Sequence, residues 1–212
     1  MIRKSLCLLF VLALALSAYA ATPITALPYT INAPGTYVLL SDLSFSVPAS
    51  AAVIINSPNV VLDLQGHRIY EVVLNDPGSI GVFILGGSVT VRNGTIDRFN
   101  VSVVANATPN FKHSNITLWG LTLNILDLSD EFPLQNAAGI RFYAIQNSLI
   151  DHCAINNSDI GIIDIDGASN RYGSIAFRNV NDALRIQLDG FYTFPNGFNL
   201  NTCNWGPQAF AP

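Results

Sequence analysis

Three aspartates in the last third of the chain have the residue type and spacing for acid–base or cation chemistry. Asp164 and Asp166 are two residues apart in an apolar stretch, and Asp189 ends the next such stretch. If these stretches are neighbouring strands, about 6.6 Å separates the Cα atoms of Asp164 and Asp166, and about 4.8 Å separates Asp166 from Asp189. Carboxylates this close either raise the pKa of one member, which suits a general acid, or bind a cation such as Ca²⁺.

The residues around these aspartates can be sorted by strand alternation, because every second side chain of a strand points to the same face. We expect an inward set in three successive strands, consisting of Ile140, Phe142 and Ala144, then Ile163 and Ile165, then Leu184, Ile186 and Leu188. The outward set supplies the candidate catalytic residues Asp164, Asp166, Asp189 and Arg185, and the candidate substrate-binding residues Arg141, Tyr143 and Gln187.

Two interpretations of the aspartates are open at this point. Inverting glycoside hydrolases need two carboxyls roughly 6.5 to 9.5 Å apart, so the spacing permits hydrolysis. Alternatively, each aspartate marks a solvated strand exit, because Gly167 follows Asp166, Gly190 follows Asp189, and a turn carboxylate accepts backbone N–H bonds.

The histidines do not have the spacing of a metal-ligand set. His67, His113 and His152 are far apart in the sequence. We expect His67 in the turn after Gly66, His113 in a loop, and His152 at an outward strand position beside an inward Cys153. We therefore predict no cofactor, with Ca²⁺ at the aspartates as the open alternative.

Internal repeats dominate the rest of the chain. Counted from Val60 through Val89, Ile116, Leu149 and Ile175, the steps are 29, 27, 33 and 26 residues, which is the range of solenoid repeats. Short runs rich in Val, Ile and Leu alternate with Asn, Gly, Asp and Ser, as in strands joined by tight turns. The pattern predicts three short strands per coil, formed by the segments 59–69, 88–96, 115–123, 147–155 and 172–180 and by the stretches 80–84, 101–104, 139–143, 160–165 and 183–188.

Three segments carry a resemblance to a known family: PGTYVL at 34–39, NVVLDLQGHRI at 59–69 and VRNGTI at 91–96. They resemble the right-handed parallel β-helix of the pectin-lyase-like superfamily, and the resemblance covers roughly residues 34–190. It implies the fold more than the function, because this architecture carries lyases, hydrolases, isomerases, adhesins and structural spacers.

The catalytic motifs that this resemblance implies are incomplete here. Polygalacturonase-like members have Asn-Thr-Asp, Asp-Asp, Gly-His-Gly and Arg-Ile-Lys motifs, and the nearest approach in this chain is Arg185-Ile186-Gln187. Lyase-like members have an aspartate-rich calcium cluster with a nearby base. The nearest equivalent of that cluster in this chain consists of Asp164, Asp166, Asp189 and Arg185.

The N-terminus predicts secretion. Arg3 and Lys4, the apolar run 6–16 and the small residues at 18 and 20 have the pattern of a signal peptide over residues 1–20. The apolar run is shorter than the roughly 20 residues of a membrane span, so we expect none in the mature chain. We predict an extracellular or, in a bacterium, periplasmic protein with an N-terminal cap at 21–50, an all-β parallel β-helix at 51–190 and a C-terminal cap or truncated tail at 191–212.

Composition excludes two classes of protein. The 212 residues are 50% hydrophobic and 11% charged, against roughly 25% charged in an average soluble domain, so the chain is not disordered. A formal net charge of −4 gives no basic field, so we expect no nucleic-acid partner.

Three further patterns each allow two interpretations. Cys153 and Cys203 can form a disulfide, or Cys153 fills a core position while Cys203 stays free. Exposed aromatic residues can stack on sugar rings or be ordinary surface residues. Sequons are glycosylation sites in a eukaryotic pathway or turn residues of a solenoid, and they begin at Asn93, Asn100, Asn106, Asn115 and Asn156. The aromatic candidates are Trp119, Trp205, Tyr143, Phe191, Tyr192 and Phe194.

Two functional hypotheses follow. The first is a secreted β-helix that binds polysaccharide or a cell-surface glycan, or has a structural surface role, without catalysis. The incomplete motifs favour it. The second is a polysaccharide lyase or glycoside hydrolase that acts on an acidic polysaccharide through the candidate aspartates, with Arg141 or Arg185 beside them.

Overall fold

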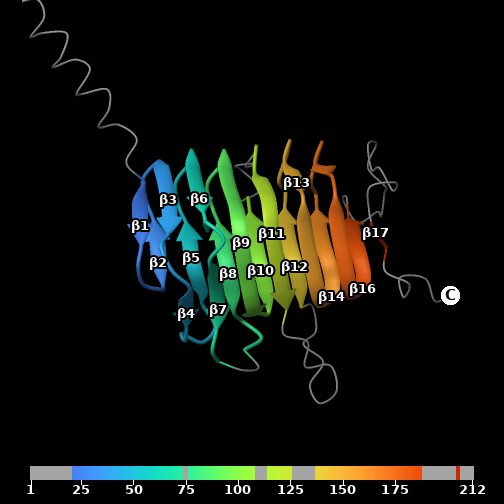
Figure 1. Ribbon diagram of the computed structural model, residues 1–212. Helices are drawn as coiled ribbons and strands as arrows, with labels where there is room; N and C mark the ends of the chain where they lie inside the picture. The colour runs from blue at the N-terminus through green and yellow to red at the C-terminus, as the bar shows by residue number, and fades with distance from the viewer. Residues whose placement is uncertain (1–20, 74–75, 108–113, 126–136, 188–203, 206–212) are drawn as a thin grey trace, which may run out of the picture.

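The computed structural model describes residues 21–73, 76–107, 114–125, 137–187 and 204–205. Within these ranges every regular element is a strand and no helix is present. The strands run parallel to their neighbours and stack as a β-solenoid of about 5 turns (Figure 1). The predicted all-β solenoid is therefore confirmed.

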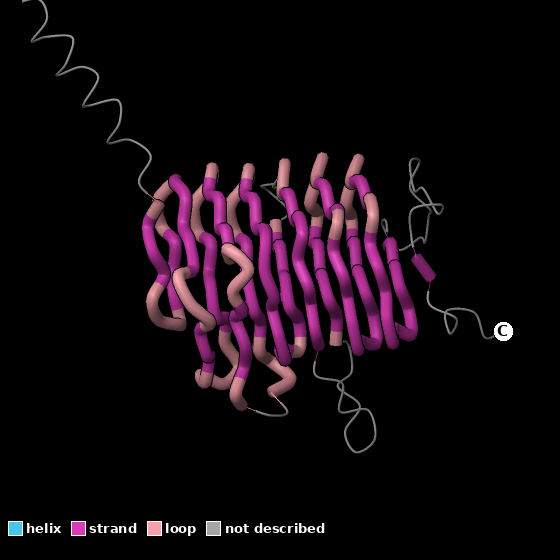
Figure 2. The backbone as a smooth tube through the Cα atoms, viewed as in Figure 1, coloured by secondary structure: helices cyan, strands magenta, loops and turns pink. Residues whose placement is uncertain are grey.

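The strands form three faces, which we call A, B and C. Face A consists of β1 (Thr22–Ile24), β3 (Gly35–Leu39), β6 (Val60–Asp63), the first parts of β9 (Val89–Phe99) and β11 (Thr117–Ile125), β13 (Leu149–Asp151) and β15 (Arg171–Tyr172). Face B consists of β4 (Leu43–Phe45), β7 (Arg68–Glu71), the second parts of β9 and β11, the first parts of β14 (Cys153–Ile165) and β16 (Ile175–Gln187), and β17 (Asn204–Trp205). Face C consists of β2 (Tyr29–Ile31), β5 (Ala51–Ile55), β8 (Ile80–Ile84), β10 (Val101–Asn106), β12 (Ala138–Tyr143) and the second parts of β14 and β16. Three strand segments per coil, as predicted, run the length of the stack, and the turns and loops lie between them (Figure 2).

The strand register confirms the predicted repeat lengths of 29 and 27 residues and corrects the predicted lengths of 33 and 26 residues. Val60 pairs with Val89, and Thr90 pairs with Thr117. Thr117 then pairs with Leu149, and Ile116 lies 32 residues from its hydrogen-bond partner Ser148 in the next coil. The following coil is only 22 residues long, because Ser148 bonds to Asn170 and Leu149 pairs with Arg171. The predicted partner of Leu149, Ile175, instead lies on face B against Cys153.

Stacked side chains fill the interior. One column on face C passes through every coil of the described chain, and its apolar members are between 0% and 8% exposed. Such burial contributes about 25 cal/mol for each Å² of apolar surface removed from water, so this packing supplies most of the driving force for the fold. The column consists of Ile31, Ile55, Ile84, Ala105, Phe142, Asp164 and Ile186.

The asparagines and serines that punctuate the sequence lie at turns with left-handed backbone. The position that precedes face A has φ between 53° and 62° in five successive coils. Asn tolerates this conformation better than most residues because its short polar side chain can bond to the local backbone. The residues of this column are Asn59, Ser88, Asn115, Asn147 and Ser169.

The segment expected to form an N-terminal cap, 21–50, contributes β1 to β4, and these strands pair in parallel with the coil that follows. In the described chain β1 pairs with β3 alone, so it is an edge strand. Pro23 lies at its centre and has no N–H to offer to another strand, which is a common way to protect a sheet edge. The expected C-terminal segment, 191–212, lies outside the described residues except for β17.

A second apolar cluster lies apart from the interior core, on the outer side of face C. Val104 and Ile163 occupy the outward column that also contains Arg141 and Arg185. Val104 and Ile163 belong, with Val101, Ala138 and Ile160, to an apolar cluster that is separate from the core. Face C therefore carries apolar side chains on both sides.

Glycines allow face C to approach face B closely. A Cβ atom at Gly161 would lie 2.5 Å from the carbonyl oxygen of Ala183 and 2.5 Å from the Phe177 ring, and Gly139 has an equally tight position against Ile155. No side chain larger than hydrogen fits at these points without displacing a neighbouring strand.

We predict that Gly161→Ala lowers the free energy of unfolding by about 1–3 kcal/mol, because the added methyl group overpacks the interior against a backbone oxygen. Denaturant unfolding followed by circular dichroism measures the change. Ala154→Val is the control, because it adds carbon atoms at a partly exposed position of the same strand and should change stability by less than about 0.5 kcal/mol. Equal stability of Gly161→Ala and the parent protein would contradict this packing.

Candidate functional site

The structure places Asp164 in the interior, and the predicted outward position is wrong. Asp164 pairs with Phe142 and Ile186, which are core residues, and it is 3% exposed. Ile163 and Ile165, predicted to be inward, instead belong to the outer cluster of face C. The alternation is displaced by one residue because isoleucines occupy both inward and outward positions of this strand, so hydrophobicity alone does not determine its phase.

Asp164 is held by two donors inside the solenoid. The Tyr172 hydroxyl and the Asn170 side-chain amide both donate to Oδ2, the latter over 2.8 Å. Among the described residues, no hydrogen-bond partner faces Oδ1. Burial raises the pKa of the Asp164 carboxyl above its usual value, and the bonds from Asn170 and Tyr172 oppose that rise without cancelling it. Asp164 is therefore an interior polar residue rather than a surface acid.

These partners extend into a ladder of buried polar groups that links three coils. Asn170 donates to the Ile145 carbonyl over 3.0 Å and accepts a bond from the backbone N–H of Ser148 over 3.0 Å. The Ser148 hydroxyl in turn accepts a bond from the backbone N–H of Ile116 over 3.0 Å. Buried polar groups need such partners, so the ladder explains why polar residues are tolerated at these interior positions.

Of the other predicted site residues that the structure describes, the two arginines and Tyr143 lie on the outward side of face C, and Asp166 lies in the turn after Asp164. Asp166 has a φ of 54° and continues the left-handed turn position of Ala144. Arg185 lies on the outward side of face C and forms an ion pair with Asp182, with Nη2 2.9 Å from Oδ2. Arg141 and Tyr143 also lie in outward columns of face C, as predicted, and both are partly exposed. Asp189 and the side chain of Gln187 lie outside the described residues.

Glu71, which the sequence analysis did not identify, is a second interior carboxyl. It pairs in register with Phe45, is 1% exposed, and its Oε1 has no hydrogen-bond partner in the part of the chain that the structure describes. Burial raises its pKa to about 7; a hydrogen bond with Ser79 opposes this rise and the negative charge of Asp76 adds to it. The sequence of the strand Arg68–Glu71 gives no sign that the carboxyl of its last residue is buried.

A row of polar and aromatic groups follows the edge between faces A and B. Asp63 pairs in register with Arg92, Arg92 with Trp119, and Trp119 with Asp151, so these four side chains occupy one column over four coils. Trp119 is 39% exposed, and its ring centre lies 4.1 Å from that of His152. We call this row, with Asn93 and His152, the polar corner.

Ion pairs and hydrogen bonds organise the polar corner. Arg92 Nε lies 2.9 Å from Asp63 Oδ2, and the Asn93 amide donates to the same carboxylate over 3.3 Å. Asp151 Oδ1 lies 3.0 Å from His152 Nδ1 and accepts the backbone N–H of Ser174 over 2.7 Å. The charged groups are thus fixed in place beside Trp119.

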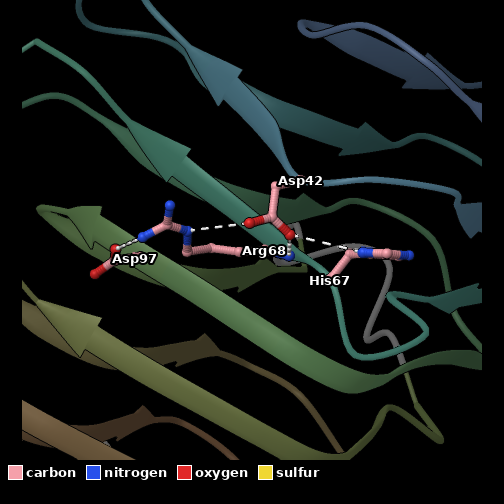
Figure 3. Close-up of polar contacts among 4 residues, drawn as sticks. All are labelled: Asp42, His67, Arg68 and Asp97. Carbon is pink, nitrogen blue, oxygen red and sulfur yellow. Dashed lines mark hydrogen bonds and ion pairs between the residues drawn. The ribbon is translucent and has the colours of Figure 1, made fainter.

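A second group of charged residues extends this corner toward the N-terminal coils (Figure 3). Asp42 lies between Arg68 and His67, with Arg68 Nε 3.7 Å from Oδ2 and His67 Nδ1 3.6 Å from Oδ1. Arg68 Nη1 also lies 3.2 Å from Asp97 Oδ2, and its guanidinium group lies 4.3 Å from the centre of the Tyr70 ring. His67 follows the Gly66 turn, as predicted.

The backbone at the polar corner is left-handed in three successive coils. Asn93, Gly120 and His152 occupy equivalent positions and have φ of 59°, 62° and 53°. His152 is therefore a turn residue and not the strand residue that we predicted. Its neighbour Cys153 is 3% exposed in the core, as expected, and burial raises the pKa of its thiol to about 11. Cys203 and His113 lie outside the described residues.

Searches for metal sites and relatives give no assignment. Among the described residues no three His, Cys, Asp or Glu side chains are grouped as metal ligands, and no helix there has the length and apolarity to cross a membrane. No protein-family model matches the sequence, and no curated protein or solved structure is detectably similar to it. The geometry of the polar corner is therefore the basis for inferring function.

We predict that Tyr172→Phe destabilises the protein by about 1–3 kcal/mol, because it removes a donor from the buried Asp164 carboxyl. Urea unfolding measures the loss. Tyr143→Phe removes a hydroxyl from the outward side of face C and is the control, with an expected change below about 0.5 kcal/mol. Equal effects of the two substitutions would mean that the Tyr172 hydroxyl does not stabilise the interior carboxyl.

We predict that Glu71 makes stability fall with rising pH. Its pKa is raised in the folded state, so its contribution is complete below pH 4.5 and is lost as the pH rises to about 7. Glu71→Gln stays uncharged and should exceed the parent protein in unfolding free energy by on the order of 2–3 kcal/mol above pH 7, with little difference below pH 4.5. Urea unfolding of both proteins across this range measures the difference, and parallel pH profiles would contradict the prediction.

Proposed function

We propose that this protein is a secreted β-helix that binds polysaccharide or a cell-surface glycan along its polar corner, without catalysing a reaction on it. The observation that carries the proposal is the exposed Trp119, which lies in register between Arg92 and Asp151. An indole face offers apolar contact to a sugar ring, while neighbouring polar groups can bond to its hydroxyls.

The spacing of the coils supports an extended ligand. Equivalent residues of successive coils lie about 4.8 Å apart, so the corner presents one polar or aromatic side chain at each step along the solenoid axis. A linear glycan that lies along this axis meets Arg92, Trp119 and Asp151 in turn, while the largely buried Asp63 holds Arg92 in place. An elongated row of this kind suits a polymer better than a small molecule, because a small ligand normally needs a concave pocket.

The lyase or hydrolase alternative has less support. It needs a set of accessible carboxyls, whereas Asp164 is buried and held by Asn170 and Tyr172. Within the polar corner, Asp63 is only 9% exposed and accepts a bond from Arg92, and the partly exposed Asp151 accepts bonds from backbone N–H groups. Both carboxylates are therefore already engaged by groups of the chain itself.

The wider assignment is also a proposal. The coil pattern at 34–39, 59–69 and 91–96 and the parallel solenoid support membership of the pectin-lyase-like superfamily. The pattern of residues 1–20 supports export to the extracellular space or the periplasm.

We expect Trp119→Ala to weaken polysaccharide binding at least about tenfold, which corresponds to about 1.4 kcal/mol, because it removes the stacking surface. Affinity electrophoresis through gels that contain one polysaccharide at a time measures binding. Val72→Ala is the matched control, because Val72 is a 45% exposed apolar residue away from the polar corner. Retarded migration that is unaffected by Trp119→Ala would exclude this site, and no retardation by any polysaccharide would overturn the proposed function.

A further inference from the structure

We infer that the ligand of the polar corner is an uncharged polysaccharide, held by stacking on Trp119 and by hydrogen bonds, and not a polyanion. This inference rests on the proposed function and specifies its class of glycan. A polyanion needs accessible cations with unmatched charge, so the ion pairs along the corner decide between the two classes of glycan.

The cation next to Trp119 is already neutralised. Arg92 forms its ion pair with Asp63 at 2.9 Å, and Asn93 donates to the same carboxylate. The Arg92 side chain is 44% exposed, so N–H groups other than Nε remain accessible to sugar hydroxyls. A carboxylate from a ligand would instead have to compete with Asp63 and would lie close to its negative charge.

The second cation is even more fully engaged. Arg68 is shared between Asp97 and Asp42, at 3.2 and 3.7 Å, and it also lies over the Tyr70 ring. Arg98 places a second guanidinium group 5.8 Å from the centre of the same ring, so two carboxylates and two guanidinium groups balance in formal charge at this end of the corner. A region without excess positive charge does not attract an anionic chain.

The remaining groups do not reverse this balance. Asp151 adds a carboxylate next to Trp119, and the exposed Arg171 adds one cation on the following strand of face A. With the group around Tyr70 included, the corner carries four aspartates and four arginines, and the whole chain has a formal net charge of −4 at pH 7. An uncharged chain can use these groups as donors and acceptors without breaking an ion pair.

The test compares three polysaccharides of different charge with the full-length protein: an uncharged β-glucan, polygalacturonate and chitosan. Isothermal titration at low and at high salt measures affinity for soluble fragments of each, for the parent protein, Trp119→Ala and Arg92→Gln. Salt screens exposed charges, so it separates ionic binding from stacking. We expect binding to the β-glucan that changes little with salt, is lost in Trp119→Ala, and falls less than about fivefold in Arg92→Gln.

The outcomes separate this inference from the proposed function. Binding of polygalacturonate or chitosan in preference to the glucan, with loss at high salt and in Trp119→Ala, would overturn the inference and leave the proposed site intact. Loss of glucan binding in Arg92→Gln as complete as in Trp119→Ala would also overturn it, because the cation would then be the main determinant. Absence of binding to all three would count against the proposed function itself.

Discussion

Parallel hydrogen bonding between successive coils is the constraint on which the rest of this molecule depends. Each strand segment takes its register from the coil before it, so a side chain that is inward in one coil has inward neighbours above and below. The column from Ile31 to Ile186 is the result, and it removes apolar side chains from water along the whole stack. Changes in coil length, from 32 residues to 22, are absorbed between strands and leave this register intact.

The same constraint explains how two carboxyls came to lie in the interior. A polar residue that falls in an inward column has no route to solvent unless the register slips, and a slip would expose every apolar residue of that strand. Asp164 is accommodated by Tyr172 and Asn170, which lie in the short segment that follows it. Fewer of the described residues bond to Glu71, whose Oε1 has no partner among them, and burial raises its pKa to about 7.

The fold could be predicted from the sequence because its signals are local: short apolar runs, a repeat, and Asn or Gly at turns. The alternation of inward and outward side chains in the strand that contains Asp164 could not be predicted, because isoleucines at adjacent positions are compatible with either face. The length of the last coil could not be predicted, because the structural equivalent of Ile150 is Tyr172, which the apolar pattern places at the first position of the segment 172–180. Trp119 was recognised as a candidate for sugar stacking, but its alignment with Asp63, Arg92 and Asp151 depends on coil lengths that no single segment reveals.

The polar corner is the part of the solenoid where chemistry is least restricted by the fold. At Asn93, Gly120 and His152 the backbone turns in a left-handed conformation, and the outward column before this turn need not fill the interior. The core has already fixed the spacing of the column, so its side chains can vary in type while they remain about 4.8 Å apart. The solenoid can therefore present a regular row of hydrogen-bond donors, acceptors and one indole ring without a dedicated binding loop. Because Asp63 and Arg92 hold each other in place, the row is preorganised, and a ligand that bonds to it loses less free energy in ordering these side chains than it would on mobile loops.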